Sequence, residues 1–163
     1  MPTEIESTGS GNWASGGIWS GSVARAGNAH DVVIKDGHNV TISQGEQANS
    51  ITVEDGGTLT ASGERTIIID DEGTASAGTN GYAVRFMSGS TISGEVNLDI
   101  RTQDDTWATL NASVGTLNDV TINHADCKLI LQGPATLAGG LTITAGELDT
   151  HSNNYALTVT GDV

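Results

Sequence analysis

The fold is decided by the stretch Val33-Ile34-Lys35-Asp36-Gly37-His38-Asn39-Val40-Thr41-Ile42-Ser43, which recurs 19 residues later as Thr52-Val53-Glu54-Asp55-Gly56-Gly57-Thr58-Leu59-Thr60-Ala61-Ser62. Each copy predicts a short strand, a turn with an acidic residue and a glycine, and a second short strand. Neither copy can bury its apolar face alone, so neighbouring copies must stack. We expect the pattern again, with drift, at residues 67–74 and 84–92, and residues 141–144 and 157–160 resemble each other.

Repeats of roughly 16 to 20 residues with two or three strands each are typical of β-solenoids. We therefore predict an all-β fold, a single-stranded right-handed parallel β-helix, with the hand that parallel crossovers normally adopt. Apolar residues at alternate positions should point inward in stacked layers. These residues are Ile34, Val40, Ile42, Ile51, Val53, Leu59, Ile67, Ile69 and Ile92.

The N-terminal segment, residues 1–30, differs from the β-solenoid expected over 31–163, because it is rich in glycine and serine around Trp13 and Trp19. This segment is either a flexible attachment arm or an irregular cap whose indoles cover the first open coil. The cap is favoured, since two tryptophans in a mobile arm would stay exposed to water.

Three residues are candidates for partner binding. Trp13 and Trp19 offer large side chains of the kind that dominate interface energies. Val163 directly follows the last predicted strand, so we expect it to mark an uncovered coil with unpaired backbone groups. Association into a homo-trimer is expected, because thin coils can shield one another's flanks.

The charge balance is strongly acidic, with 20 Asp and Glu against 6 Lys and Arg and a formal net charge of −14. The basic residues are scattered singly, which argues against nucleic acid and anionic membranes as partners. No apolar stretch approaches the length of a membrane span, and residues 1–7 lack a secretory signal pattern, so we expect synthesis in a cytoplasm. The single cysteine, Cys127, cannot form a disulfide within the chain.

Asp36, Asp55 and Asp71, with Ser88 after them, are expected at equivalent turn positions of successive repeats. At a strand spacing of about 4.8 Å, such carboxylates could share a calcium ion. Solvated turn acids are preferred, because neither an EF-hand loop nor a nonapeptide calcium repeat occurs in the chain. The three aspartates are therefore weak metal candidates, and no cofactor is predicted.

An enzymatic role is not predicted either. Asp99 shares a strand face with Arg101, but no motif ties either residue to a cleft. Carboxylate pairs for glycoside cleavage could be drawn only from acids that the pattern does not bring together. These acids are Asp70, Asp71, Asp104 and Asp105.

Other polar residues give weaker signals. The four histidines lack the spacing of metal ligands. Threonine pairs at Thr142/Thr144 and Thr158/Thr160 suggest ice binding, but they are too few in line to form a flat array. Ice binding is therefore not expected from the sequence.

A resemblance adds to these inferences. The run Asn12-Trp13-Ala14-Ser15-Gly16-Gly17-Ile18-Trp19-Ser20-Gly21, followed by Asp31-Val32-Val33-Ile34-Lys35-Asp36-Gly37-His38-Asn39-Val40-Thr41-Ile42, resembles a module of phage virion proteins and bacterial surface adhesins. That module leads from two tryptophans around a glycine-rich turn into the first coils of a β-helix. One departure is residues 23–27, which lack the proline that such modules usually carry before the aspartate-led strand.

The resemblance implies a non-enzymatic phage virion protein of the head-decoration or tail-spike type. Its partners would be capsid or tail proteins, and its location the virion. The short length and the absence of a secretion signal favour this reading over an adhesin. Two alternatives stay open: a glycan-binding fragment of a bacterial adhesin, and a carbohydrate-cleaving β-helix enzyme.

Overall fold

The computed structural model describes residues 3–23, 25–69, 81–103, 105–110 and 115–163. The regular structure of this part is β, apart from two short 3₁₀ turns, and none of its helices is long and apolar enough to cross a membrane. The elements are β1 (Thr3–Glu6), β2 (Gly11–Asn12), η1 (Gly16–Ile18), η2 (Ser20–Ser22), β3 (His30–Ile34), β4 (Asn39–Ile42), β5 (Glu46–Ala48), β6 (Ser50–Val53), β7 (Thr58–Ala61), β8 (Arg65–Ile69), β9 (Tyr82–Phe86), β10 (Thr91–Ser93), β11 (Val96–Ile100), β12 (Asp105–Thr109), β13 (Val120–Leu131), β14 (Ala135–Leu137), β15 (Leu141–Asp149) and β16 (Leu157–Val159).

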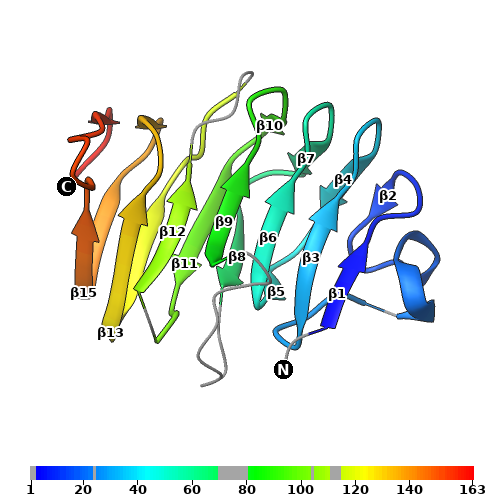
Figure 1. Cartoon of the computed structure of the whole chain (residues 1–163). Helices are drawn as coiled ribbons and strands as arrows, with labels where there is room; N and C mark the ends of the chain where they lie inside the picture. Colours follow the sequence, from blue (N-terminus) through cyan, green and yellow to red (C-terminus); the bar gives the residue numbers. More distant parts are fainter. Residues whose placement is uncertain (1–2, 24, 70–80, 104, 111–114) are drawn as a thin grey trace.

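The largest sheet, called the main sheet below, has the order β1-β3-β6-β9-β12-β13-β11-β8-β5. Its two arms meet at the long strand β13, whose C-terminal half pairs with β12 and whose N-terminal half pairs with β11. β15 pairs with β13. The main sheet is therefore curled, with β1, β3, β6, β9 and β12 in front of β5, β8 and β11 in Figure 1.

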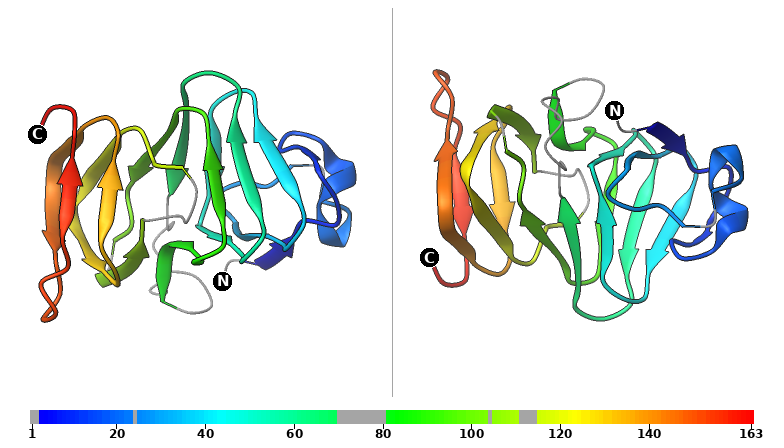
Figure 2. Two further views of the ribbon diagram at one scale, coloured as in Figure 1. Left: turned by 90° about the horizontal axis from the view of Figure 1, so that it is seen from above. Right: turned by 90° about the horizontal axis from the view of Figure 1, so that it is seen from below.

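Two smaller sheets, called the side sheets below, have the orders β10-β7-β4-β2 and β14-β16. Leu117 forms a parallel bridge with Leu137, which places the segment before β13 beside β14. The pairings between the named strands are all parallel. In both views of Figure 2 the colours run from blue at one end to red at the other, so the segments follow one another in chain order along one axis.

The strand pairing confirms the 19-residue repeat. Ile34 pairs with Val53, and Val40 pairs with Leu59. In the next repeat Val53 pairs with Phe86, which is 33 residues further along the chain. Three strands follow one another before each return to the same sheet position, as in β3-β4-β5 and β6-β7-β8.

The expected register of residues 67–74 is wrong. Their strand, β8, pairs with β5 and β11 and not with β6, so it is the third strand of its repeat. Residues 141–144 and 157–160 do not stack on each other either, because β15 pairs with β13 and β16 with β14. Short alternating strands look alike at all three positions, so the sequence pattern does not distinguish them.

The core is a stack of thin, mainly aliphatic layers. The nine residues predicted to point inward are all buried, with at most 2% of their surface exposed. Later repeats continue the layers with Leu98, Ile122 and Leu129, each exposed by 1% or less. Because burying one such side chain contributes about 1.5–3 kcal/mol, many stacked layers are needed to offset the entropy of ordering the chain.

The N-terminal segment is packed against the first repeat and is not a free arm. β1 pairs with β3, and β2 pairs with β4. Trp13 is fully buried and Trp19 is 3% exposed, with their rings edge to face at 5.3 Å between centroids. The Trp19 Nε1–H donates to the carbonyl of Trp13 at 2.8 Å, and the Trp13 Nε1–H donates to the carbonyl of Ala26 at 3.3 Å.

The opposite end of the structure is more open. Ile143 is 47% exposed and Val163 is 93% exposed. Leu148, Leu157 and Val159 are partly buried and pack against the core from one side. Two of the three exposed large hydrophobic side chains in the described part of the chain, Ile143 and Val163, therefore lie at this end.

Ile69→Asp tests the stacked core. We expect it to lower the free energy of unfolding by about 4 kcal/mol or more, since an unpaired charge would be buried between Ala48 and Ile100, the pairing partners of Ile69. Thr66→Asp in the same strand is the control, because Thr66 is not buried, and it should cost less than about 1 kcal/mol. Urea unfolding followed by circular dichroism measures both, and equal costs would contradict the predicted layering.

Candidate functional site

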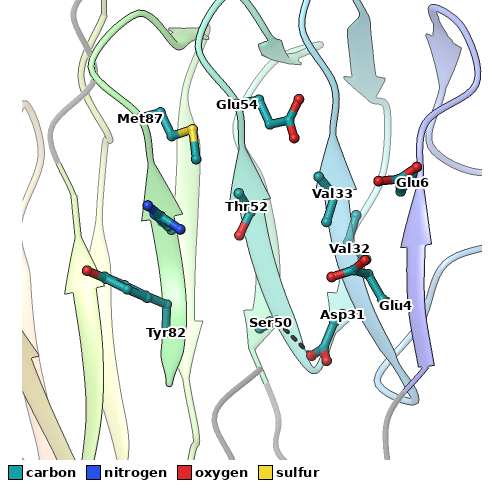
Figure 3. Close-up of a pocket in the computed structure, with 11 residues that line it drawn as sticks. Glu4, Glu6, Asp31, Val32, Val33, Ser50, Thr52, Glu54, Tyr82 and Met87 are labelled. Atoms are coloured by element: carbon teal, nitrogen blue, oxygen red, sulfur yellow. Dashed lines mark hydrogen bonds between the residues drawn. The ribbon is translucent and has the colours of Figure 1, made fainter. Parts of the chain in front are cut away.

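A hollow of about 150 Å³ lies on the outer face of β1, β3, β6 and β9 in the main sheet. Alternate residues of these strands point outward, so neighbouring strands bring polar side chains together across the face. The hollow is too small to enclose a drug-sized ligand, so anything bound there would extend over the surface. Figure 3 shows the residues that line it, which are Glu4, Glu6, Asp31, Val32, Val33, Ser50, Thr52, Glu54, Tyr82, Arg85 and Met87.

Lys35 partly neutralises two carboxylates of the hollow. The Lys35 ammonium lies 2.9 Å from Glu54 Oε1 and 3.2 Å from Glu6 Oε1. Hydrogen bonds to Glu54 and then Glu6 raise the pKa of Lys35 above its ordinary value, so it stays charged. Glu4, Glu6 and Glu54 nevertheless leave an excess of acceptor oxygens over donors at this face.

Asp31 lines the hollow and is 5% exposed. Its Oδ1 accepts hydrogen bonds from Asn49 Nδ2 at 2.6 Å and from Ser50 Oγ at 2.7 Å. A buried carboxylate held by two donors keeps a fixed orientation. Asp31 therefore supports the hollow structurally, as Figure 3 illustrates for its bond with Ser50.

Two aromatic rings and a guanidinium adjoin the hollow, and we call Tyr82, Arg85 and Trp107 the ring platform. The rings of Tyr82 and Trp107 meet edge to face at 5.5 Å between centroids, and Arg85 Cζ lies 5.1 Å from the centroid of Tyr82. Trp107 is 43% exposed. A second hollow of about 390 Å³ is also lined by Tyr82 and Arg85, so the ring platform borders both.

The sequence pattern did not identify the ring platform. Tyr82 and Trp107 pair across β9 and β12 at an irregularity in the ladder between Trp107 and Ala108. The only sequence signal is an outward tryptophan in the alternating segment β12, whose exposed and buried residues follow one another. Which ring it would meet depends on the register of strands that are far apart in the chain.

The turn aspartates do not form the expected ladder of three. Asp36 and Asp55 occupy equivalent turns, but the strands flanking the next turn place Ser88 directly after Asp55. Asp71 lies outside the described residues, and the strand before it belongs to a different sheet position. A Cβ on Gly56 would collide with the Asp36 carboxylate, and one on Gly89 with that of Asp55, so each carboxylate covers the next turn.

The acids proposed for metal binding or catalysis are not gathered into one group in the described part of the chain. No group of three or more His, Cys, Asp or Glu there could hold a metal ion. Asp99 is paired with Arg101, whose Nε lies 3.0 Å from the Asp99 carboxylate. Asp105 begins β12 opposite Lys128. The remaining glycosidase candidates, Asp70, Asp71 and Asp104, lie outside the described residues.

The three candidates for partner binding differ in accessibility. Trp13 and Trp19 are buried, so in this structure their indoles offer no surface to a partner. Docking through them would require the N-terminal segment to leave the core. Val163 is 93% exposed and is therefore accessible.

Sequence reasoning also missed a buried acid. Glu46 stands at an inward position of β5 with its side chain fully buried, and Arg25 Nη2 lies 2.8 Å from its Oε2. Burial raises the pKa of Glu46 above its ordinary value, although Arg25 opposes the shift. Because the folded state then holds the proton more tightly, this contribution to stability is present at low pH and is lost as the pH rises through the raised pKa.

Glu46→Gln tests this titration. The variant cannot titrate at position 46. Its melting temperature should therefore rise relative to that of the wild type as the pH is raised from about 4 to about 7. Thermal unfolding at a series of pH values measures the difference between the two proteins. A difference that stays constant over this range would show that Glu46 does not titrate abnormally.

No family model matches this chain, and no curated protein or solved structure matches it either. Its function must therefore be argued from its own residues and geometry.

Proposed function

We propose that this chain is a non-enzymatic phage virion protein, a head-decoration protein or short tail spike, built as a single-stranded right-handed parallel β-helix. In this proposal it acts by stiffness and by binding, and it associates as a homo-trimer with capsid or tail proteins. The strand order supports the β-helix, because each of three strand positions recurs in the next repeat with parallel pairing.

The observation that carries the virion assignment is the closed indole pair at the first repeat. Trp13 and Trp19 are bonded to each other and to Ala26, and they cover the apolar layer of the first strands. The tryptophan-turn-tryptophan segment of the phage module would begin a β-helix in this way. A covered first layer also limits pairing with other chains at this end.

The charged groups of the main sheet support a role without turnover. Around the hollow, Lys35 ties Glu6 and Glu54 into ion pairs, and further along the sheet Lys128 lies 3.3 Å from both Glu147 and Asp149. General acid–base catalysis needs a group whose pKa is poised near the working pH and which reaches the substrate. Hydrogen bonds to acidic partners raise the pKa of Lys35 and of Lys128, and a hydrogen bond from the His151 backbone lowers the pKa of Asp149, so these three pKa values move away from neutrality.

Purified phage particles test the virion assignment. We expect mass spectrometry of particles induced from the source strain to detect this chain in fixed ratio to the capsid or tail proteins, and the flanking genes to encode such proteins. Sedimentation of the isolated chain should give the mass of a trimer. Its absence from purified particles would overturn the virion assignment, and a monomer at high concentration would overturn the trimer.

The ring platform favours a second candidate function, the glycan-binding adhesin fragment. The exposed indole of Trp107 can pack against the apolar face of a sugar ring, while the carboxylates of the adjoining hollow accept hydrogen bonds from its hydroxyls. The net charge of −14 disfavours acidic glycans, so the ligand would be neutral.

Trp107→Ala tests glycan binding. On a neutral-glycan array the wild type should bind at least one structure, and loss of the indole should weaken that binding by about tenfold or more, as expected for a central aromatic contact. Ile143→Ala is the control, because Ile143 is similarly exposed but lies on β15, away from the ring platform. No binding by the wild type, or equal losses in both variants, would contradict the candidate.

A further inference from the structure

The outer face of the side sheets carries a regular array of hydroxyl groups. In β4, β7 and β10 the buried residues Val40, Leu59 and Ile92 are each flanked by residues that are not buried. The same holds for Leu117 and Leu137, which bridge each other in parallel. We call these outer residues the hydroxyl face; they are Asn39, Thr58, Thr91, Thr116, Thr136 and Thr158 in a first column and Thr41, Thr60 and Ser93 in a second.

Strand pairing aligns the first column in two parts, one over β4, β7 and β10 and one over Thr116, β14 and β16. Asn39 pairs with Thr58, Thr58 with Thr91, and Thr136 with Thr158. The bridge of Leu117 to Leu137 sets Thr116 beside Thr136. Residues 115–118 adjoin β10 and the chain after it, because a Cβ on Gly115 would meet the Ile92 carbonyl and the Asn118 N–H donates to Val96 at 2.9 Å. Figure 1 shows β2, β4, β7 and β10 side by side.

The second column is shorter than the first. The residues that follow Leu117 and Leu137 are Asn118 and Ala138. The Asn118 Nδ2 donates to Asn97 Oδ1 at 3.0 Å, and Ala138 has no hydroxyl group. The Thr160 hydroxyl is used within the fold, since it donates to the carbonyl of Leu137 at 2.9 Å. The two-column part of the hydroxyl face therefore covers β4, β7 and β10, and a separate single column runs over Thr116, β14 and β16.

The hydroxyl face is free of charge in a chain with 20 acidic and 6 basic residues. Its nine residues are seven threonines, one serine and one asparagine, without an aromatic ring. By contrast, the outer positions of the main sheet carry Glu6, Arg85, Trp107 and Lys128. Because the residues named on both faces are half-buried or exposed, the difference does not follow from folding alone.

The spacing of the hydroxyl face is fixed in two directions. Neighbouring strands lie about 4.8 Å apart, and alternate residues along a strand lie about 6.7 Å apart. Threonine is restricted in χ1, so its hydroxyl and methyl groups keep defined directions. Thr60 Oγ1 also donates to Asn39 Oδ1 at 2.9 Å, which ties neighbouring strands together across the two columns.

We propose that the hydroxyl face binds ice. The ligand must be uncharged and must repeat in two directions at spacings close to those of the strands, and the water lattice of ice meets both conditions. Hydroxyl groups can take the place of lattice waters as donors and acceptors, while the methyl groups between them order the adjoining water. A crystalline glycan is less suited, because the face lacks aromatic rings on which sugars could stack.

The threonine pairs singled out in the sequence are not the ones that form this array. Thr142 and Thr144 lie on β15, which pairs with β13 of the main sheet. Of the second pair, Thr158 alone joins the first column, at its end. The two pairs therefore do not stand in line with each other, and the array is formed instead by residues that the register aligns from repeats up to 33 residues apart.

Slow growth of an ice hemisphere from a solution of the purified chain tests the proposal. We expect the wild type to enter the ice and to inhibit ice recrystallisation, whereas a carrier albumin is excluded. Thr91→Tyr, in the middle of the hydroxyl face, should reduce incorporation to the level of the carrier. Thr121→Tyr is the matched control, because Thr121 is an outward threonine of β13 in the main sheet, and it should keep wild-type incorporation.

The outcomes separate ice binding from its alternatives. Circular dichroism and melting temperature show whether each variant folds, and Thr136→Lys, which adds a charge without a ring, replaces Thr91→Tyr if that variant unfolds. Exclusion of the wild type from ice would overturn the proposal, as would equal losses in Thr91→Tyr and Thr121→Tyr. Binding to crystalline cellulose or chitin without incorporation into ice would also overturn it. None of these outcomes depends on whether the chain is part of a virion.

Discussion

Parallel backbone pairing between successive repeats is the interaction on which the rest of the structure depends. Each repeat places only a few side chains inside, so no layer is stable without the next one. A slip of β6 by one residue against β3 would turn Ile51 and Val53 towards water and bring Thr52 into the core. The pairing therefore fixes the core and, through the same register, the columns of outward side chains.

The turns preserve this register although the repeats differ in length. The Asp36 carboxylate covers Gly56, and the Asp55 carboxylate covers Gly89, where a Cβ would collide with it. Gly56 also has a φ of 80°, which L-residues other than glycine rarely adopt. The acid and the glycine of the repeated motif thus form one packing unit between turns, which explains their recurrence without a metal ion. The extra residues between β8 and β9 leave this stacking of turns unchanged.

The inward layers could be predicted from sequence because alternation along a strand has a short period that a few residues reveal. The sheet position of β8 could not, because its alternation fits any of the three positions. Glu46 breaks the alternation at an inward site and is tolerated only because Arg25, 21 residues earlier, reaches its carboxylate. The ring platform and the hydroxyl face depend on register across repeats of unequal length, which the sequence does not display. Whether residues 1–30 form a cap or an arm could not be decided from the sequence, because the sequence does not show which groups the Trp13 indole contacts.

The two outer surfaces differ in chemistry although they share one scaffold. The main sheet carries carboxylates, cations and an exposed indole, whereas the hydroxyl face carries only uncharged polar groups. Outward strand positions are weakly constrained by packing, and charge anywhere on them would serve solubility. None of the 26 charged residues of the chain occupies any of the nine positions of the hydroxyl face. Neither folding nor solubility accounts for this absence of charge. The rigid strand spacing that stabilises the core also holds this array at fixed intervals, so a ligand with a matching lattice could bind without ordering the protein further.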